Sequence, residues 1–396
     1  MMETMSHKSF GSRLLEFVFI STIILRTFVS FQFLGEENIV MRLLSIVCAM
    51  GCLYYVALLL LRKAAFSFIS LSLLVIFVYY AFISIVNERY LVSLLGRAMD
   101  IFVLWGYFEN NRDDFYSAMR NIMYVSAACV FINFVLVLLF PEGLWESEME
   151  VGNKMFYFLG GNYNSFGPRM LCSMLVILTC CQYRKRYYLL FFLLFAASVV
   201  SVLLTGSKTS LVGISLLFIY FLFLGRKPHK IIFLFSVFAV LLFETLIVFL
   251  DFNIGDIEIA KHFIEDILQK DTDFTYRTEL WQQSLVCISE HPIFGYGYVD
   301  NDWWSHNISV YARGSHNFVL CELIYGGVVG LLMWTCLTCS VIRKTIPSSF
   351  KYVLCIGLSC LLLMMCFEVY GAFYLVFILF LIYYYSLQNN DADAQS

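Results

Sequence analysis

The sequence predicts an all-α polytopic membrane protein, and three observations favour that class. Of its 396 residues, 61% are hydrophobic and only 14% are charged, whereas about a quarter of the residues are charged in soluble domains. The mean hydropathy is +0.79. Apolar runs of roughly 17 to 25 residues, long enough to cross a bilayer as helices, follow one another along most of the chain. We expect a single integral membrane domain over residues 1–396.

The apolar runs predict about twelve transmembrane helices. They lie near residues 14–34, 39–61, 66–86, 91–108, 119–140, 167–183, 187–205, 208–225, 231–251, 317–341, 350–369 and 371–388. The first run follows Lys8 and Arg13 and lacks a small-residue cleavage site, so we interpret it as an uncleaved signal anchor.

Basic residues in the connections predict the orientation, because Lys and Arg favour the cytoplasmic side of short loops. The basic groups fall on alternate connections and therefore on one side: Lys8 and Arg13, Arg62 and Lys63, Arg112 and Arg120, Arg184 to Arg186, Arg226 to Lys230, and Arg343 to Lys351. Both termini are then cytoplasmic. The long acidic segment at residues 252–315, between predicted helices 9 and 10, is then extracytoplasmic.

That segment is the longest polar stretch of the chain, and we expect two short surface helices in it. The apolar residues of 257–268 and 280–288 approximate helical spacing. The second helix should end near His291, because the residue before Pro292 is pushed out of the α region, and Gly295 and Gly297 then mark a turn. Only Cys287 falls in the segment, so no disulfide framework is predicted. The sequence has no basic cluster with interleaved aromatic residues, so nucleic acid is not predicted as a partner.

Three cations stand at helix starts on the predicted outer side: Arg169 after Gly167-Pro168, Lys208 after Gly206-Ser207, and Arg277 at the start of the second surface helix. Free backbone N–H groups at a helix start favour anions, and guanidinium suits phosphate oxygens. The three can converge on a diphosphate. The alternative is that each pairs with a nearby carboxylate or a lipid headgroup.

His316 precedes a predicted transmembrane helix at the water boundary, where a neutral imidazole can accept a proton from a hydroxyl. Gly327 lies eleven residues further on and nearly on the same helix face, which predicts a smooth groove below His316. Gly326 and Gly330 are spaced for close helix packing. The alternative for His316 is an interfacial histidine that only forms hydrogen bonds.

Aromatic residues are dense around this segment, and four of them are candidate glycan-binding residues: Trp281, Tyr296, Trp303 and Trp304. Their rings can stack on the apolar faces of sugars, but membrane-interface belts are also rich in Trp and Tyr. His291, His306 and His316 lack a compact ligand spacing, so we predict no metal site.

Six charged residues fall within predicted spans, where charge is costly and usually functional or paired: Arg26, Arg97, Asp100, Glu244, Glu322 and Glu368. Arg97 and Asp100 are three apart on one helix and are expected to pair. Glu322 follows His316 on a different face of its helix and can still border the same cavity.

Five segments in this order resemble the O-antigen ligase and polymerase superfamily. They are Asn162-Tyr163-Asn164-Ser165-Phe166-Gly167, Thr205-Gly206-Ser207-Lys208, Arg277 with Trp281, His291-Pro292-Ile293-Phe294-Gly295-Tyr296-Gly297, and His316-Asn317 with Gly327. The resemblance covers most of the second half of the chain. One departure is Lys208, where the family often has arginine, so the charge is kept and the bidentate geometry is lost.

The resemblance implies an inverting glycosyltransferase of the GT-C type in the bacterial inner membrane, with an extracytoplasmic active site and no metal or other cofactor. His316 would activate the acceptor hydroxyl, and Arg277 with Lys208 and Arg169 would hold the diphosphate. The implied partners are a polyprenyl-diphosphate-linked oligosaccharide and membrane lipid, with a flippase and a chain-length regulator as further candidates.

Three functions stay open at this point. A polymerase would join lipid-linked repeat units into a surface polysaccharide, and this function is favoured because such polymerases are numerous and diverse. A ligase would pass a finished glycan to a lipid A core. A transporter or flippase would instead show inverted repeats and broken helices at mid-membrane, whereas the unusual residues here cluster at the outer mouth.

Overall fold

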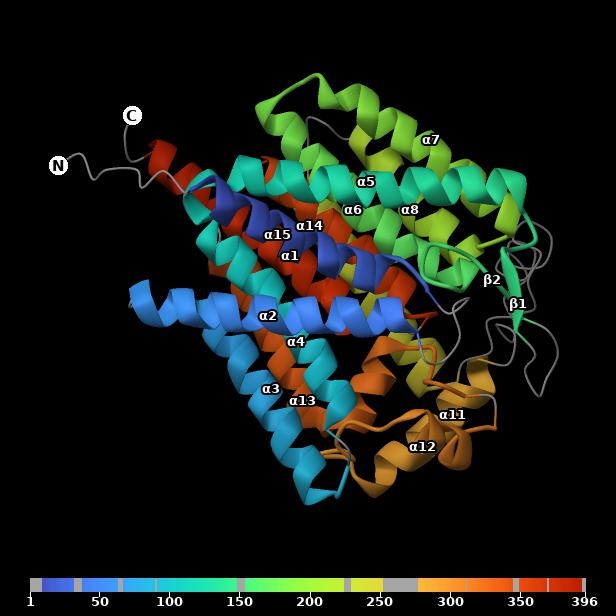
Figure 1. Cartoon of the computed structure of the whole chain (residues 1–396). Helices are drawn as coiled ribbons and strands as arrows, with labels where there is room; N and C mark the ends of the chain where they lie inside the picture. The colour runs from blue at the N-terminus through green and yellow to red at the C-terminus, as the bar shows by residue number, and fades with distance from the viewer. Residues whose placement is uncertain are drawn as a thin grey trace.

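The computed structural model is a bundle of long helices (Figure 1). It describes residues 9–31, 38–62, 67–89, 91–147, 154–223, 229–251, 277–310, 312–344, 349–368 and 370–393. The start of the first helix and the end of the last lie at one end of the bundle, and a small hairpin lies at the other (Figure 1). We call the second end the site end.

Twelve of the described helices coincide with the twelve predicted spans, which confirms the all-α polytopic class. They are α1 (Phe10–Phe28), α2 (Ile39–Arg62), α3 (Phe68–Val86), α4 (Val92–Asn110), α5 (Phe115–Leu139), α6 (Phe166–Tyr183), α7 (Tyr187–Thr205), α8 (Lys208–Phe223), α9 (His229–Phe243), α13 (Phe318–Lys344), α14 (Ser349–Met365) and α15 (Ala372–Asp393). The described residues include 6 helices that are long and apolar enough to cross a membrane, and shorter apolar helices correspond to α8, α9, α14 and α15.

The centre of the bundle is formed by α6 and α15. In the most apolar window of α6, 83% of the residues are buried inside the protein, and Leu375 to Ile382 of α15 are all buried. α6 packs against α5, α7, α8, α14 and α15. Two glycines allow the helices to pack closely. An added Cβ would collide with Met364 at Gly213 and with Leu175 at Gly357.

Directly after α9 the chain forms a helical turn that is wider than an α-helical one. Residues Glu244–Phe249 form a π-helical stretch, η4, a geometry that is rare and frequent at functional sites. It directs Glu244, which is buried, toward the start of α13.

A helix is confirmed where the second surface helix was predicted: α11 (Arg277–Glu290) ends one residue before His291, as expected. A short helix that the sequence did not predict, α12 (Asn301–Asn307), follows it, with Asp300 capping its start. The first predicted surface helix, over 257–268, lies outside the described residues.

The loop between α11 and α12 completes the hydrogen bonds of a broken helix. α13 is interrupted at Gly327, which has φ +61°. Val328 and Val329 then donate to the carbonyls of Pro292 and Ile293, while the N–H groups of Tyr296 and Gly297 donate to Ile324 and Tyr325. Gly327 therefore faces the loop and not a lipid groove, so the predicted smooth groove is wrong at this residue.

Two glycines of the same loop explain why the segment from His291 to Gly297 needs its turn residues. Gly295 and Gly297 have φ +70° and +78°. A Cβ on Gly295 would lie 2.6 Å from the backbone of Gly327, and one on Gly297 would lie 2.7 Å from the backbone of Ser84. The predicted turn is confirmed, and its role is to seat the loop against α3 and α13.

Close packing at Gly326 and Gly330 is also confirmed. A Cβ on Gly326 would approach the Tyr80 ring of α3 to 2.8 Å, and one on Gly330 would approach the Tyr80 hydroxyl oxygen to 2.8 Å. The Tyr80 hydroxyl donates to Glu322 of α13, so this contact joins apolar packing to a buried polar pair.

A β-hairpin that the sequence analysis did not predict precedes α6 at the site end (Figure 1). β1 (Trp145–Ser147) pairs antiparallel with β2 (Lys154–Phe156), with Trp145 opposite Phe156. A 3₁₀ turn, η3 (Tyr163–Ser165), then leads into α6. Another 3₁₀ turn, η2 (Arg112–Asp114), joins α4 to α5.

Candidate active site

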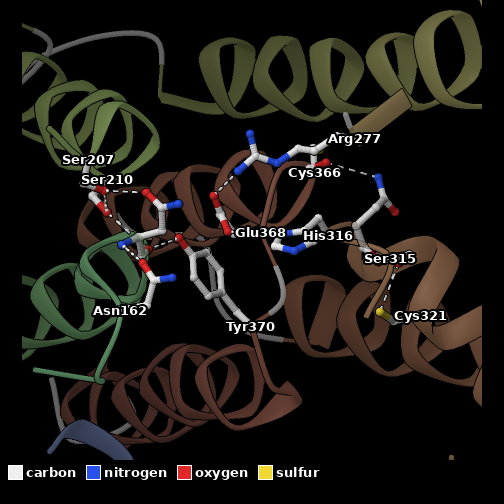
Figure 2. A network of polar contacts seen from close by, with 12 residues as sticks. Asn162, Ser207, Ser210, Arg277, Ser315, His316, Cys321, Cys366, Glu368 and Tyr370 are labelled. Atoms are coloured by element: carbon white, nitrogen blue, oxygen red, sulfur yellow. Dashed lines mark hydrogen bonds and ion pairs between the residues drawn. The ribbon is translucent and has the colours of Figure 1, made fainter. Parts of the chain in front are cut away.

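Glu368 joins Arg277 and His316 at the site end (Figure 2). Its Oε1 pairs with the Arg277 guanidinium, and its Oε2 lies 3.3 Å from Nδ1 of His316. Three parts of the chain meet here: the first residue of α11, the segment before α13, and the connection from α14 to α15. Glu368 is 6% exposed at its side chain whereas His316 is 37% exposed, so the carboxylate is enclosed and the imidazole is reachable.

The backbone of His316 has an uncommon conformation. Its φ is +51°, in the left-handed region that few residues other than glycine adopt. Such conformations persist where the surrounding structure enforces them, and they cluster at active sites. Ser315 contributes to this enforcement, since its hydroxyl donates to the Asn317 carbonyl at 2.7 Å across His316.

Asn317 fixes the position of His316 from the other side. Its Oδ1 accepts the Leu320 N–H at 3.0 Å and caps α13. Its Nδ2 donates to both carboxylate oxygens of Glu244, at 2.9 and 3.0 Å, and to the Cys366 carbonyl at 3.3 Å. One buried amide thus ties the start of α13 to η4 and to the end of α14.

Arg277 is positioned by Trp281, four residues later on the same face of α11. The Trp281 indole is fully buried and packs edge-on against Phe243, with ring centroids 6.0 Å apart. Phe243 in turn packs on Phe367, next to Glu368. The aromatic contacts therefore set the rotation of α11 that directs Arg277 toward Glu368.

This arrangement is suited to general-base chemistry. If Nδ1 of a neutral His316 imidazole donates to Glu368, the other ring nitrogen is unprotonated and can accept a proton. The carboxylate also stabilises the imidazolium that forms after proton transfer. Arg277 adds a positive charge beside the place where a leaving group would gain negative charge.

A second polar cluster lies next to the first one (Figure 2). The Tyr370 hydroxyl donates to the Asn164 carbonyl at 2.7 Å, and Ser207 and Ser210 donate to the side chain and carbonyl of Asn164 at 3.4 Å. The Asn-rich segment and the start of α8 are therefore held together, and Tyr370 connects them to the Glu368 segment.

The three predicted cations have different surroundings. Arg277 shares Glu368 with His316. Lys208 begins α8 beside Ser207, and its ammonium group makes no hydrogen bond or ion pair with the residues that the structure describes. Arg169 donates to the backbone carbonyls of Thr27, Phe28 and Ser165, so its guanidinium is held at the end of α1.

The glycan-binding prediction is corrected for three residues. Trp281, Trp303 and Trp304 are 0%, 7% and 1% exposed, so their rings pack against protein and offer no face to a sugar. Tyr296 is partly exposed, but its hydroxyl bonds the Cys287 carbonyl and Glu290, and its ring packs on His291 and Trp303. The rings of Tyr296 and Trp303 pack the loop against α12, and Trp304 packs edge-on against Tyr325 of α13.

The expected pairing of Arg97 with Asp100 is also wrong. Asp100 instead forms an ion pair with Arg26 of α1 at 2.7 Å, and the Arg97 guanidinium lies 4.8 Å above the Tyr298 ring. Arg26 lies on the neighbouring helix α1 and reaches the Asp100 carboxylate, so the ion pair forms between two helices and not within α4. Glu322 borders a cavity that Arg97 also lines, but His316 is not among the residues that line this cavity.

Glu368 was not predicted as a site residue, although one signal was present in the sequence. It was one of six charged residues within predicted spans, and intramembrane charge often marks function. No sequence spacing connects Glu368 to His316, because 52 residues and a whole transmembrane hairpin separate them. Among the described residues, no group of three or more His, Cys, Asp or Glu side chains has a metal-binding arrangement.

Fold and site together define a multi-pass membrane protein with an acid–base cluster at one end of its helix bundle. Residues 190–335 match the family model described as O-antigen ligase. The matched segment carries Lys208, Arg277 and His316, and it ends before Glu368. The resemblance to the O-antigen ligase and polymerase superfamily is therefore confirmed.

A curated relative gives the same result. The chain is 30% identical over 130 residues to a protein of Pseudomonas aeruginosa named O-antigen ligase. The match covers 33% of this chain and 28% of the relative. The chain thus aligns with about a quarter of the length of that relative.

Proposed function

We propose that this protein is a polysaccharide polymerase of the bacterial inner membrane. It would transfer a glycan from a polyprenyl diphosphate to a hydroxyl of another lipid-linked repeat unit. The observation that carries this proposal is the contact of Glu368 with both His316 and Arg277, because it places a base and a cation together. The family match supports the same class of glycosyltransferase.

In the proposed reaction, His316 accepts the proton of the acceptor hydroxyl at its Nε2. The hydroxyl oxygen attacks the anomeric carbon while the bond from that carbon to the diphosphate oxygen breaks. The diphosphate leaves with the bonding electron pair, and attack from the opposite face inverts the configuration. Glu368 holds the imidazole through Nδ1, at 3.3 Å, and balances the charge of the imidazolium.

Arg277 and Lys208 are the proposed diphosphate ligands. A guanidinium has five N–H donors, so the bond from Arg277 to Glu368 does not exhaust its capacity for phosphate oxygens. Lys208 begins α8, where free backbone N–H groups add to its charge. These fixed cations would stabilise the leaving group, so we propose no metal or other cofactor. Arg169 is not among the proposed donor ligands, because backbone carbonyls hold its guanidinium at the end of α1.

The proposed topology follows the basic residues of the connections. Both termini would be cytoplasmic, and the site end would face the extracytoplasmic side, where lipid-linked glycans are presented after translocation. A flippase that delivers them and a regulator of chain length are the proposed protein partners.

A ligase is the second candidate function, because the relative from Pseudomonas aeruginosa is named O-antigen ligase. The same base and cations would serve both reactions, and only the acceptor differs. In the ligase reaction, the hydroxyl would belong to a lipid A core.

The test uses the purified full-length protein in lipid nanodiscs with lipid-linked repeat units. A ladder of lengthening lipid-linked chains is the expected product. Transfer that occurs only after lipid A core is added would favour the ligase. If neither product forms, the glycosyltransferase proposal is wrong.

His316→Ala and Arg277→Ala should abolish the product while the protein still elutes as a monodisperse species. The matched controls are His306→Ala, whose side chain is exposed and bonds the Asp302 carbonyl, and Arg313→Ala, which is exposed. Both controls should keep near-normal activity. A normal ladder from His316→Ala or Arg277→Ala would contradict the assignment.

A further inference from the structure

Two cavities adjoin each other at the site end, and neither is lined by Arg277, His316 or Glu368. One has a volume of about 400 Å³ and lies among α1, α3, α4, α13 and α15. The other, of about 840 Å³, lies between α1, α2 and the turn before α6. Their shared wall consists of Arg26, Thr27 and Arg169. Both volumes fall in the range of about 300–1,000 Å³ that is usual for small-molecule sites.

The described residues that line the two cavities carry an excess of positive charge. The larger cavity is lined by Arg26, Arg42 and Arg169, and none of its described lining residues is acidic. The smaller cavity adds Arg97 and two carboxylates, Asp100 and Glu322. Leaving Arg42 aside, three arginines face two carboxylates, in a part of the molecule where uncompensated charge is costly.

The two arginines of the shared wall are held in fixed positions. Arg26 is bound by Asp100 at 2.7 Å and also donates to Ser45. Arg169 donates to the carbonyls of Thr27 and Phe28, each at 3.1 Å, and lies 5.3 Å above the Tyr374 ring. Carbonyls and a ring position Arg169 without neutralising it, so its full charge remains for an anion.

Arg97 also lines the smaller cavity and supports the same conclusion. Protein surrounds it, yet its side chain is solvent-accessible because it borders the cavity. It lies over the Tyr298 ring and makes no hydrogen bond or ion pair with the part of the chain that is described. Burial raises the pKa of the Tyr298 phenol to about 12, so this ring stays neutral, and the Glu322 carboxylate acts on Arg97 in the cavity.

The smaller cavity begins beside the candidate active site. Phe318, two residues after His316, and Tyr370, two residues after Glu368, both line it. A molecule bound there would lie next to the base without occupying the place between Arg277 and His316. That is the position expected for the head group of a substrate whose reacting hydroxyl is separated from its phosphate by a few sugars.

We propose that these two cavities bind the diphosphate of the acceptor, a second polyprenyl-linked glycan. One chain would then hold two lipid diphosphates, with the donor at Arg277 and Lys208 and the acceptor at Arg26, Arg97 and Arg169. Guanidinium groups match phosphate oxygens in geometry and charge. This assignment rests on the proposed function, since it presumes a lipid-linked acceptor.

The test counts bound diphosphates, which does not require turnover. Native mass spectrometry of the full-length protein in nanodiscs would be run with polyprenyl diphosphate and, separately, with inorganic diphosphate. We expect two equivalents of the lipid on the wild type. Arg277→Ala should lose one of them, and Arg97→Gln should weaken the other at least tenfold, whereas Arg97→Lys should weaken it less. Inorganic diphosphate should compete at both sites if the head group alone is recognised.

The matched control is Arg120→Gln, because Arg120 likewise lies over a tyrosine ring, at 5.9 Å from that of Tyr116, but does not line either cavity. The Arg120→Gln variant should bind two equivalents of polyprenyl diphosphate. One equivalent on the wild type, or two on Arg97→Gln with unchanged affinity, would overturn the proposal. So would displacement of the second equivalent by ordinary phospholipid. A wild type that binds two diphosphates but forms no glycan product would refute the proposed function alone.

Discussion

Replacing Glu368 by glutamine tests whether the carboxylate orients the base. The amide is nearly the same size but has one acceptor oxygen and one NH₂ donor, whereas the carboxylate accepts from both Arg277 and His316. If the amide oxygen faces Arg277, its NH₂ faces Nδ1 of His316 and forces the proton onto Nε2. The imidazole then cannot accept a proton from the acceptor hydroxyl.

The expected loss follows from the geometry. A positioned general base contributes about 10²- to 10⁴-fold in rate. The contact between Nδ1 of His316 and Oε2 of Glu368 is long, at 3.3 Å, and the His316 side chain is 37% exposed. Water can therefore partly replace the carboxylate as the partner of Nδ1. We therefore expect kcat to fall about 100-fold, which corresponds to about 2.7 kcal/mol in the activation free energy.

The assay is the initial rate of ladder formation at saturating lipid-linked substrate. Glu279→Gln is the matched control, because Glu279 lies on the exposed side of α11 and its rate should match the wild type. Glu368→Asp should keep part of the activity, because it retains the charge on a shorter side chain. A Glu368→Gln rate within threefold of the wild type would refute the orienting role.

Three further predictions concern the parts that position the site. Trp281→Ala removes a fully buried indole, so it should cost about 3–5 kcal/mol of stability and lower activity with it; an unchanged melting temperature would contradict this. Asn317→Ala removes a helix cap and the partner of buried Glu244, a loss of about 2–4 kcal/mol that thermal unfolding should detect. Gly295→Ala should destabilise more than Gly206→Ala: both have positive φ, but only at Gly295 would the new Cβ meet backbone, and equal melting temperatures would refute the clash.

The sequence predicted the membrane helices well, because a run of apolar residues long enough to span a bilayer is a local property. Spans 187–205 and 39–61 were placed within a residue of α7 and α2. The end of α11 was equally predictable, since Pro292 restricts the residue before it. The hairpin of β1 and β2 was missed because strands of three residues carry too little alternation to recognise.

Contacts between distant segments were much less predictable. Arg97 and Asp100 have the correct spacing to pair on one helix, but Arg26 of another helix binds Asp100. The indoles of Trp303 and Trp304 have the composition of a sugar-binding surface, but they are buried. In both cases a local pattern allowed two outcomes, and packing against another element selected one.

The sequence by itself determined the membrane class, the positions of the membrane-spanning helices, and the presence of Arg277 and His316 as candidate site residues. It could do so because hydropathy and motif order are read along one chain. Only the tertiary structure decided that Glu368 lies between these two residues, that Trp281 orients α11, and that Arg26, Arg97 and Arg169 face common cavities. Those relations join helices that are far apart in sequence, so they depend on how the bundle packs.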